Sequence, residues 1–199
     1  MKKLLWFCYF LSLASFGQEQ YSLVDSKKAQ EELNETYTNP ETSILLEEDL
    51  EDFKGLDFFP LDEKYIVEAT FVRTPDEEPF EMPTTTDRTP IYVKYAEVYF
   101  TIDNKELKLN VYQETSFVDK PGLEDYLFMP FHDLTNGVET YGGGRYLDLR
   151  IPEEDTILID FNRTYNPYCV YNPKYSCPIP PEENDLDIEI RAGVLNFKQ

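Results

Sequence analysis

The stretch YIVEATF at residues 65–71 sets the class of the fold. Apolar side chains recur at every second position along it, so that one face carries Tyr65, Val67, Ala69 and Phe71. A period of two is typical of a strand with one buried face. Further short apolar stretches bounded by turn residues predict strands at residues 91–101, 106–113, 126–131, 145–151, 156–161 and 186–192, and a short edge strand at 79–82. This pattern predicts a mainly β domain, either an antiparallel sandwich or a small barrel.

The chain before this region has a helical period instead. Asp25 and Ser26 can cap a helix in which apolar residues recur four positions apart, namely Ala29, Leu33 and Tyr37. A second short helical turn is indicated at residues 46–53, and Gly55 can end it. We therefore divide the chain into a signal peptide, a helical segment packed on the domain and an antiparallel β domain, at residues 1–17, 18–55 and 56–199.

The first residues have the features of a secretory signal peptide. Lys2 and Lys3 precede an apolar run over residues 4–13, and small residues follow at positions 15 and 17. The run is far shorter than the ~20 residues that a membrane-spanning helix needs, and an uncleaved anchor is the alternative. We therefore predict a secreted or periplasmic protein that has no membrane span after signal cleavage.

The charge of the chain excludes one class of partner. The formal net charge is −21, and cleavage after Gly17 would remove Lys2 and Lys3 and take it to −23. Nucleic acid and anionic membrane surfaces repel such a protein. The acidic surface either attracts a cationic partner or simply keeps a secreted protein soluble.

Two cysteines remain after signal cleavage, Cys169 and Cys177. An even number of cysteines in an oxidising compartment predicts a disulfide between them. A reduced pair that binds metal or acts in redox chemistry is the alternative. Their spacing is not that of a C-x-x-C motif, and His132 is the only histidine of the chain, so we predict no metal site and no cofactor.

Two segments carry the polar side chains from which a site could be built. Residues 139–145 read ETYGGGR, and three successive glycines allow a tight turn or the close approach of a ligand. Residues 161–169 read FNRTYNPYC and contain several turn-forming residues. We expect both segments to meet at one end of the sheet and to place the ligand-binding residues at the mouth of a site: Tyr141, Arg145, Tyr146, Arg163 and Asn166.

The two arginines of these segments have two interpretations. The forked guanidinium groups of Arg145 and Arg163 suit a carboxylate or phosphate, so they could clamp an anionic ligand. They could instead pair within the protein, with Asp133, Asp148 or Asp160. The glycines could likewise form a plain hairpin.

Three functions follow from these features, and the sequence leaves open whether the protein is an enzyme. The first is a module that binds an unknown small or extended ligand, and the high content of Phe and Tyr also suits an aromatic-lined sugar or lipid pocket. The second is a hydrolase with Asp133 and Asp160 as acid and base, which requires both carboxyl groups in one cleft within ~10 Å. The third is a structural or interaction protein without a small-molecule site. Calcium binding is a further alternative, with Asp133, Asn162, Asn166 and Asn184 as ligands.

Five stretches carry a resemblance to a known family. They are FKGLDFFP at 53–60, FHDLTNG at 131–137, ETYGGGRYLDL at 139–149, IDFNRTYNP at 159–167 and CPIPPEEN at 177–184. In these the chain resembles DUF1684, a family of bacterial and archaeal proteins of unknown function. The family pattern ends in alanine-glycine-glutamate, whereas this chain reads AGV at 192–194. The resemblance implies a compact domain with its signature in the C-terminal half and implies no activity.

Overall fold

The computed structural model describes residues 21–197 of the chain. The predicted signal peptide, residues 1–17, lies outside this part. Two helices, α1 (Leu23–Thr38) and α2 (Glu47–Leu50), precede the strands. No helix of residues 21–197 combines the length and the apolar character that crossing a bilayer requires.

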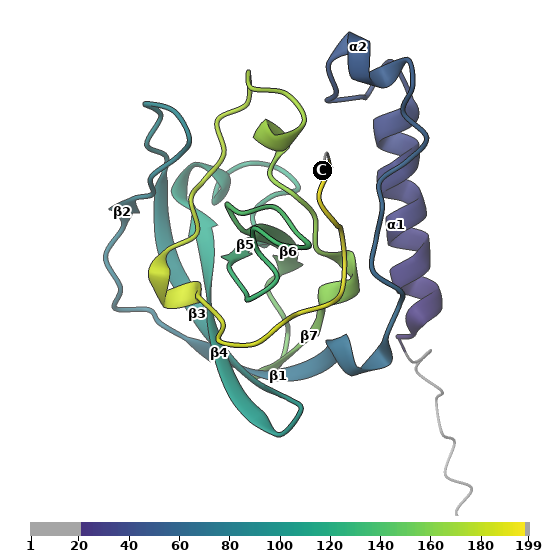
Figure 1. Cartoon of the computed structure of the whole chain (residues 1–199). Coiled ribbons are helices and arrows are strands. Elements are labelled where there is room, and N and C mark those ends of the chain that lie inside the picture. Colours follow the sequence, from purple (N-terminus) through teal and green to yellow (C-terminus); the bar gives the residue numbers. More distant parts are fainter. Residues whose placement is uncertain (1–20, 198–199) are drawn as a thin grey trace, which may run out of the picture.

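The strands form one antiparallel sheet that curls into a half-barrel (Figure 1). The strand order is β6-β5-β4-β3-β1-β7, and β2 pairs with the start of β3. The prediction of a mainly β, antiparallel fold is confirmed, and the sheet takes the form of a half-barrel. The strands are β1 (Ile66–Arg73), β2 (Phe80–Glu81), β3 (Ile91–Ile102), β4 (Lys105–Glu114), β5 (Tyr126–Phe131), β6 (Arg145–Arg150) and β7 (Thr156–Asp160).

A long hairpin of β3 and β4 forms the middle of the sheet. Asp103 and Asn104 connect the two strands with φ angles of 49° and 62°, the left-handed conformation of a two-residue hairpin turn. The pairing register shifts between Lys94 and Ala96, where one extra residue makes a bulge. A bulge bends a strand and increases its twist, which favours the curl of the sheet.

The main hydrophobic core lies against the inner face of the curled sheet. The face predicted from residues 65–71 belongs to it, together with alternate residues of β3 to β7. The C-terminal segment closes this core, because Leu186, Ile190 and Ala192 are buried in the same cluster. A second cluster lies on the outer face and includes Tyr92, Tyr112, Phe128, Tyr146 and Cys177.

The strand predicted at residues 186–192 is wrong. The segment runs beside the loop after β5, where the Leu186 N–H donates to the His132 carbonyl at 2.8 Å and the Leu134 N–H donates to the Ile188 carbonyl at 2.9 Å. It has no strand as a neighbour in the sheet. The alternation of Leu186, Ile188 and Ile190 therefore reflects the burial of one side of this segment. The backbone bonds to the loop after β5 do not make it a strand of the sheet.

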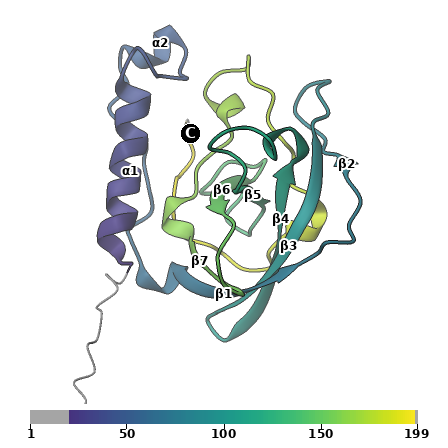
Figure 2. The ribbon, with the colours of Figure 1, turned by 180° about the vertical axis from the view of Figure 1, so that it is seen from behind.

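Helix α1 lies at the side of the sheet (Figure 2) and is fixed to it by polar contacts. The N-cap is Ser22, which forms a capping box with Asp25, so the cap predicted at Asp25 and Ser26 is wrong. Ser26 is buried, and its hydroxyl donates to Asp160 at 2.7 Å. One turn later Gln30 donates to the Asn162 carbonyl at 2.7 Å.

Gly193 is required where the C-terminal segment passes the end of β7. Its φ angle is +76°, a conformation that costs an L side chain about 1–2 kcal/mol. A Cβ atom at this position would overlap the Thr164 hydroxyl and lie 2.8 Å from the Phe161 carbonyl oxygen. The segment can therefore pass this point only with glycine.

We predict that Gly193→Ala lowers the free energy of unfolding by about 2–5 kcal/mol, because the left-handed conformation and the overlap with Thr164 both oppose it. Urea denaturation of the full chain measures this loss. Gly122→Ala is the matched control, since its φ is +84° and no atom lies within 4 Å of the added Cβ. It should cost about 1–2 kcal/mol. Equal losses for the two variants would show that the contact with Thr164 is not a constraint.

Candidate functional site

The glycine turn and the cysteine-containing segment meet in the folded chain. Gly144 has a φ angle of +88°, and a Cβ on it would lie 2.7 Å from the Phe131 carbonyl and 2.8 Å from Pro180. Immediately after the turn, Tyr146 and Tyr165 exchange backbone hydrogen bonds of 2.9 and 3.0 Å. The Tyr146 hydroxyl donates to the Pro178 carbonyl. Both segments thus contribute to one region at the start of β6.

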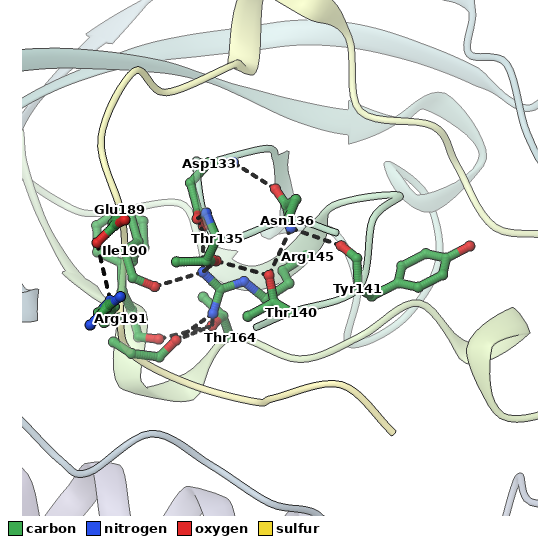
Figure 3. A network of polar contacts seen from close by, with 12 residues as sticks. Asp133, Thr135, Asn136, Thr140, Tyr141, Arg145, Thr164, Glu189, Ile190 and Arg191 are labelled. Atoms are coloured by element: carbon green, nitrogen blue, oxygen red, sulfur yellow. Dashed lines mark hydrogen bonds and ion pairs between the residues drawn. The ribbon is translucent and has the colours of Figure 1, made fainter. Parts of the chain in front are cut away.

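The Arg145 side chain, labelled in Figure 3, lies within a network of polar contacts. It is fully buried, with 0% of its surface exposed. Its guanidinium forms an ion pair with Asp133 and donates to the carbonyls of Ile190, at 2.8 Å, and Ala192. Burial lowers the pKa of Arg145, and the charge of Asp133 opposes that effect. Arg145 therefore joins segments inside the protein. Of the two interpretations that the sequence left open, the structure shows internal pairing with Asp133.

Asp133 is held by the loop that follows it. Its second carboxylate oxygen accepts hydrogen bonds from the backbone N–H and the hydroxyl of Thr135, at 2.6 and 2.5 Å. Thr135 contacts the Thr140 hydroxyl at 2.8 Å, and Asn136 donates to that hydroxyl at 2.9 Å and to the Tyr141 carbonyl at 2.8 Å (Figure 3). This loop is ordered by the same carboxylate that neutralises Arg145.

Asp160 belongs to a different set of contacts. One of its oxygens accepts from the backbone and side-chain N–H groups of Asn162, both at 2.9 Å, and the other from Tyr21 and Ser26, both at 2.7 Å. Asp160 is 5% exposed and Asp133 is 6% exposed. Catalysis by this pair would require both to reach one substrate, yet each is enclosed by its own partners.

The other predicted ligand-binding residues are divided between the interior and the surface. Asn166 is buried and donates to the Leu195 carbonyl at 3.0 Å and to the Tyr171 hydroxyl at 3.2 Å. Tyr141 is half-buried beside Gly143. Tyr146 and Arg163, by contrast, each line a surface cavity.

The residues proposed for calcium are also used inside the protein. Asn162 donates to the Asp62 carbonyl at 3.0 Å. The Asn184 amide accepts from the Asn110 N–H at 2.8 Å and donates to the carbonyls of Asn110 and Pro130 at 2.9 and 2.7 Å. Strands β4 and β5 share a single register pair, Tyr112 and Phe128. The Asn184 side chain therefore supplies hydrogen bonds that the main chains of β4 and β5 do not make with each other.

A cavity of about 250 Å³ opens on the outer face of the sheet, and we call it the aromatic pocket. Strands β3 to β6 and the segment 165–178 surround it. Most of its lining is aromatic, and a carboxylate stands on β6 and another at the end of β4. The lining residues are Arg88, Tyr92, Glu114, Phe117, Tyr126, Phe128, Tyr146, Asp148, Tyr165, Tyr168, Ser176, Cys177 and Pro178.

A second cavity of about 160 Å³ adjoins the aromatic pocket and extends toward α1. The two cavities share Asp148, Tyr165 and Tyr168 as lining residues. The second one is also lined by Arg163 and by Leu33 of α1. Together they offer a ligand a path from the face of β5 and β6 to the helix.

Asp148 is the polar centre of the aromatic pocket. One of its carboxylate oxygens accepts hydrogen bonds from the hydroxyls of Tyr126, at 2.7 Å, and Tyr165, at 2.6 Å. Burial is the largest cause that raises the pKa of both tyrosines, and the charge of Asp148 is the second. Both tyrosines therefore remain protonated donors. Asp148 itself is exposed to solvent. The pocket therefore presents a carboxylate of fixed position among aromatic rings.

Cys169 and Cys177 carry free thiols in the structure, which does not show the predicted disulfide. The Cys169 N–H donates to the Cys177 sulfur at 3.1 Å, so the two residues are adjacent. A hydrogen bond with the Cys177 thiol lowers the pKa of Cys169 to about 6, and the same contact raises the pKa of Cys177. Because Cys177 lines the aromatic pocket, this pair lies at its wall.

Most residues of the aromatic pocket were not predicted from the sequence. A signal was present at residues 126–131, which read YLFMPF and are apolar on both faces. A strand with two apolar faces must be covered on both sides. Phe128 and Tyr146 follow this rule, since they lie on the face opposite Leu127 and Leu147.

Comparison with known proteins identifies relatives but no ligand. Residues 51–195 match the family described as "Protein of unknown function (DUF1684)". The chain is similar to the solution NMR structure of an uncharacterized protein from Haloarcula marismortui, with 31% sequence identity and a TM-score of 0.68. That similarity covers 89% of this chain and 96% of the other. No match is found among curated proteins.

We predict that Asp133→Asn lowers the free energy of unfolding by about 3–5 kcal/mol, because it leaves the Arg145 charge buried without a counter-charge. Urea denaturation measures the loss. Asp125→Asn is the control, since it breaks an exposed ion pair with Arg150 and should cost less than about 1 kcal/mol. A loss in Asp133→Asn no larger than in this control would contradict a stabilising role for the buried pair.

We also predict that Cys169 of the reduced chain reacts with iodoacetamide through a thiolate whose formation has its midpoint near pH 6. The rate should fall below that pH, because protonation removes the nucleophile, and should level off above pH ~7. Peptide mass spectrometry over a pH series measures it. In Cys177→Ala the donor is lost and the midpoint should move toward the ordinary value of about 8.5. The same midpoint in both forms would contradict the assigned cause.

Proposed function

The chain belongs to the DUF1684 family of proteins of unknown function, and from its surface cavities we propose that it is a binding module for a small or extended ligand. The ligand lies in the aromatic pocket, and an extended one continues into the second cavity along Asp148, Tyr165 and Tyr168. The observation that carries this proposal is a solvent-accessible carboxylate fixed by two tyrosine hydroxyls inside an aromatic concavity.

The shape and lining of the pocket support this function. Ligand sites are typically concave, mostly apolar or aromatic, and contain a few fixed polar groups that orient the ligand. The aromatic pocket has these features, and the hydrogen bonds of Tyr126 and Tyr165 hold Asp148 in place before any ligand arrives. A site that is already ordered loses less entropy when it binds.

The Arg145 network serves a different purpose in this proposal. Arg145, Asp133 and Asn184 bind backbone groups of the protein itself and lie outside both cavities. Their role is to hold the segments that surround the pocket. The buried polar residues of the motifs thus serve folding, whereas the ligand is bound by the outer face of β5 and β6, to which the motifs contribute Tyr146 and Asp148.

We propose that the protein acts in a secreted or periplasmic setting, on the basis of the N-terminal signal features. In an oxidising compartment the adjacent thiols of Cys169 and Cys177 would be oxidised to a disulfide. That bond would fix the segment 169–177 at the wall of the aromatic pocket. Mass spectrometry of the protein under non-reducing conditions tests this, because the reduced and oxidised forms differ by two hydrogens.

We predict that Tyr168→Ala weakens binding in the aromatic pocket roughly 3- to 10-fold, because an aromatic contact contributes about 0.5–1.5 kcal/mol. Saturation-transfer NMR of the full chain with a library of neutral and charged fragments measures the affinities. Tyr99→Ala is the matched control, since Tyr99 is 43% exposed and Tyr168 is 42% exposed, and Tyr99 does not line the pocket.

Fragment binding that is weakened in Tyr168→Ala and unchanged in Tyr99→Ala supports the binding function. If no fragment binds in a manner that depends on Tyr168, the aromatic pocket is not a ligand site and the proposal fails. The third function, a structural or interaction protein, would then be favoured.

A further inference from the structure

We propose that the ligand of the aromatic pocket is an organic cation, a protonated or quaternary amine held beside Asp148 and enclosed by aromatic rings. This inference rests on the binding function proposed above and specifies its ligand class. Three features of the pocket lead to it: its charge, its rings and the state of its hydroxyl groups.

The pocket carries more negative than positive charge. Asp148 and Glu114 contribute two carboxylates, and Arg88 contributes the single guanidinium among the lining residues. Arg88 is exposed, and its guanidinium donates to the Ser176 carbonyl at 3.2 Å, so it is bound at the rim. The whole chain has a formal charge of −21, which adds a long-range attraction for cations. An anionic ligand would meet the opposite field.

The rings of the pocket form a connected aromatic surface. The ring centroids of Phe128 and Tyr146 are 4.7 Å apart, and Tyr92 follows at 5.9 Å from Phe128. Tyr165 continues the series at 5.9 Å from Tyr146, and Tyr168 at 6.4 Å from Tyr165. Aromatic faces attract a cation through their quadrupole, and Tyr is among the effective partners. A carboxylate bordered by several such rings suits an ammonium group with apolar substituents.

Three of the tyrosine hydroxyl groups that could serve a neutral polyol are already engaged. Tyr126 and Tyr165 donate to Asp148, and Tyr146 donates to Pro178. Both tyrosine bonds end on the same oxygen of Asp148. The other oxygen, Oδ2, makes no hydrogen bond or ion pair within residues 21–197, so it is free to face a positive charge. A quaternary amine needs no hydrogen bond, which matches a lining in which these three hydroxyl donors are committed to protein acceptors.

The test compares choline with its neutral isostere 3,3-dimethyl-1-butanol, and methyl β-glucoside serves as the sugar probe. Each is titrated into the full chain and followed by calorimetry and by the NMR shifts of the pocket tyrosines. We expect choline to bind at least tenfold more tightly than the isostere. We expect Asp148→Asn, which removes the charge and keeps the shape, to weaken choline about tenfold and to leave the isostere unchanged.

Two further variants complete the test. Glu97→Gln is the matched control, because Glu97 is also a carboxylate that accepts a tyrosine hydroxyl, that of Tyr99, and it lies outside the pocket. It should bind choline as the unmodified chain does. Tyr168→Leu keeps an apolar side chain and removes the ring, so it should weaken choline more than the isostere.

The cation is ruled out if choline and its isostere bind equally, or if Asp148→Asn binds choline as well as the unmodified chain. It is also ruled out if methyl β-glucoside binds in the pocket and choline does not. In each of these cases the binding function stands with a different ligand. The failure of the binding function itself is distinct, because it requires that no fragment binds in a manner that depends on Tyr168.

Discussion

A guanidinium removed from solvent needs a counter-charge and hydrogen-bond acceptors, and the terminal nitrogens of Arg145 find them only where several segments converge. Asp133 supplies the charge, and the carbonyls of Ile190 and Ala192 supply acceptors. A buried charge that loses its partner costs several kcal/mol. The loop after β5, the start of β6 and the C-terminal segment are therefore bound to one position. Without the contacts of Arg145, the C-terminal segment would no longer be held against the inner core that it closes.

The position of the C-terminal half also determines where a ligand could bind. Once β6 begins at Arg145, its alternate residues Tyr146 and Asp148 face outward, toward the segment 165–178. Tyr165 is fixed there by backbone bonds to Tyr146 and by its hydroxyl bond to Asp148. The inner face of the sheet thus provides stability and the outer face provides the cavity. The Arg145 network and the aromatic pocket lie on opposite faces of the sheet, and the motif ETYGGGRYLDL contributes to both through Arg145 and through Tyr146 and Asp148.

Periodicity predicted those parts of the fold that depend on local burial. The face of Tyr65, Val67, Ala69 and Phe71 is in the core, and the strands predicted at residues 91–101 and 106–113 are β3 and β4. The same rule failed at residues 186–192, because an alternating pattern does not tell whether the neighbour is a strand or a side chain such as Arg145. The helix cap was assigned to residues 25 and 26, since a buried serine and a capping serine look alike in sequence.

The candidate site was only partly predictable, for a related reason. Arg145 and Asn166 were predicted to bind a ligand because of their residue types. In the structure both bind backbone carbonyls of the protein itself. Tyr146 and Arg163 do line cavities, but Tyr126, Phe128 and Asp148 become neighbours only through the curl of the sheet. One consequence concerns synthesis on the ribosome. The N–H and carbonyl of Asn110 bond to the amide of Asn184, so the junction of β4 and β5 is completed only after residue 184 has been translated.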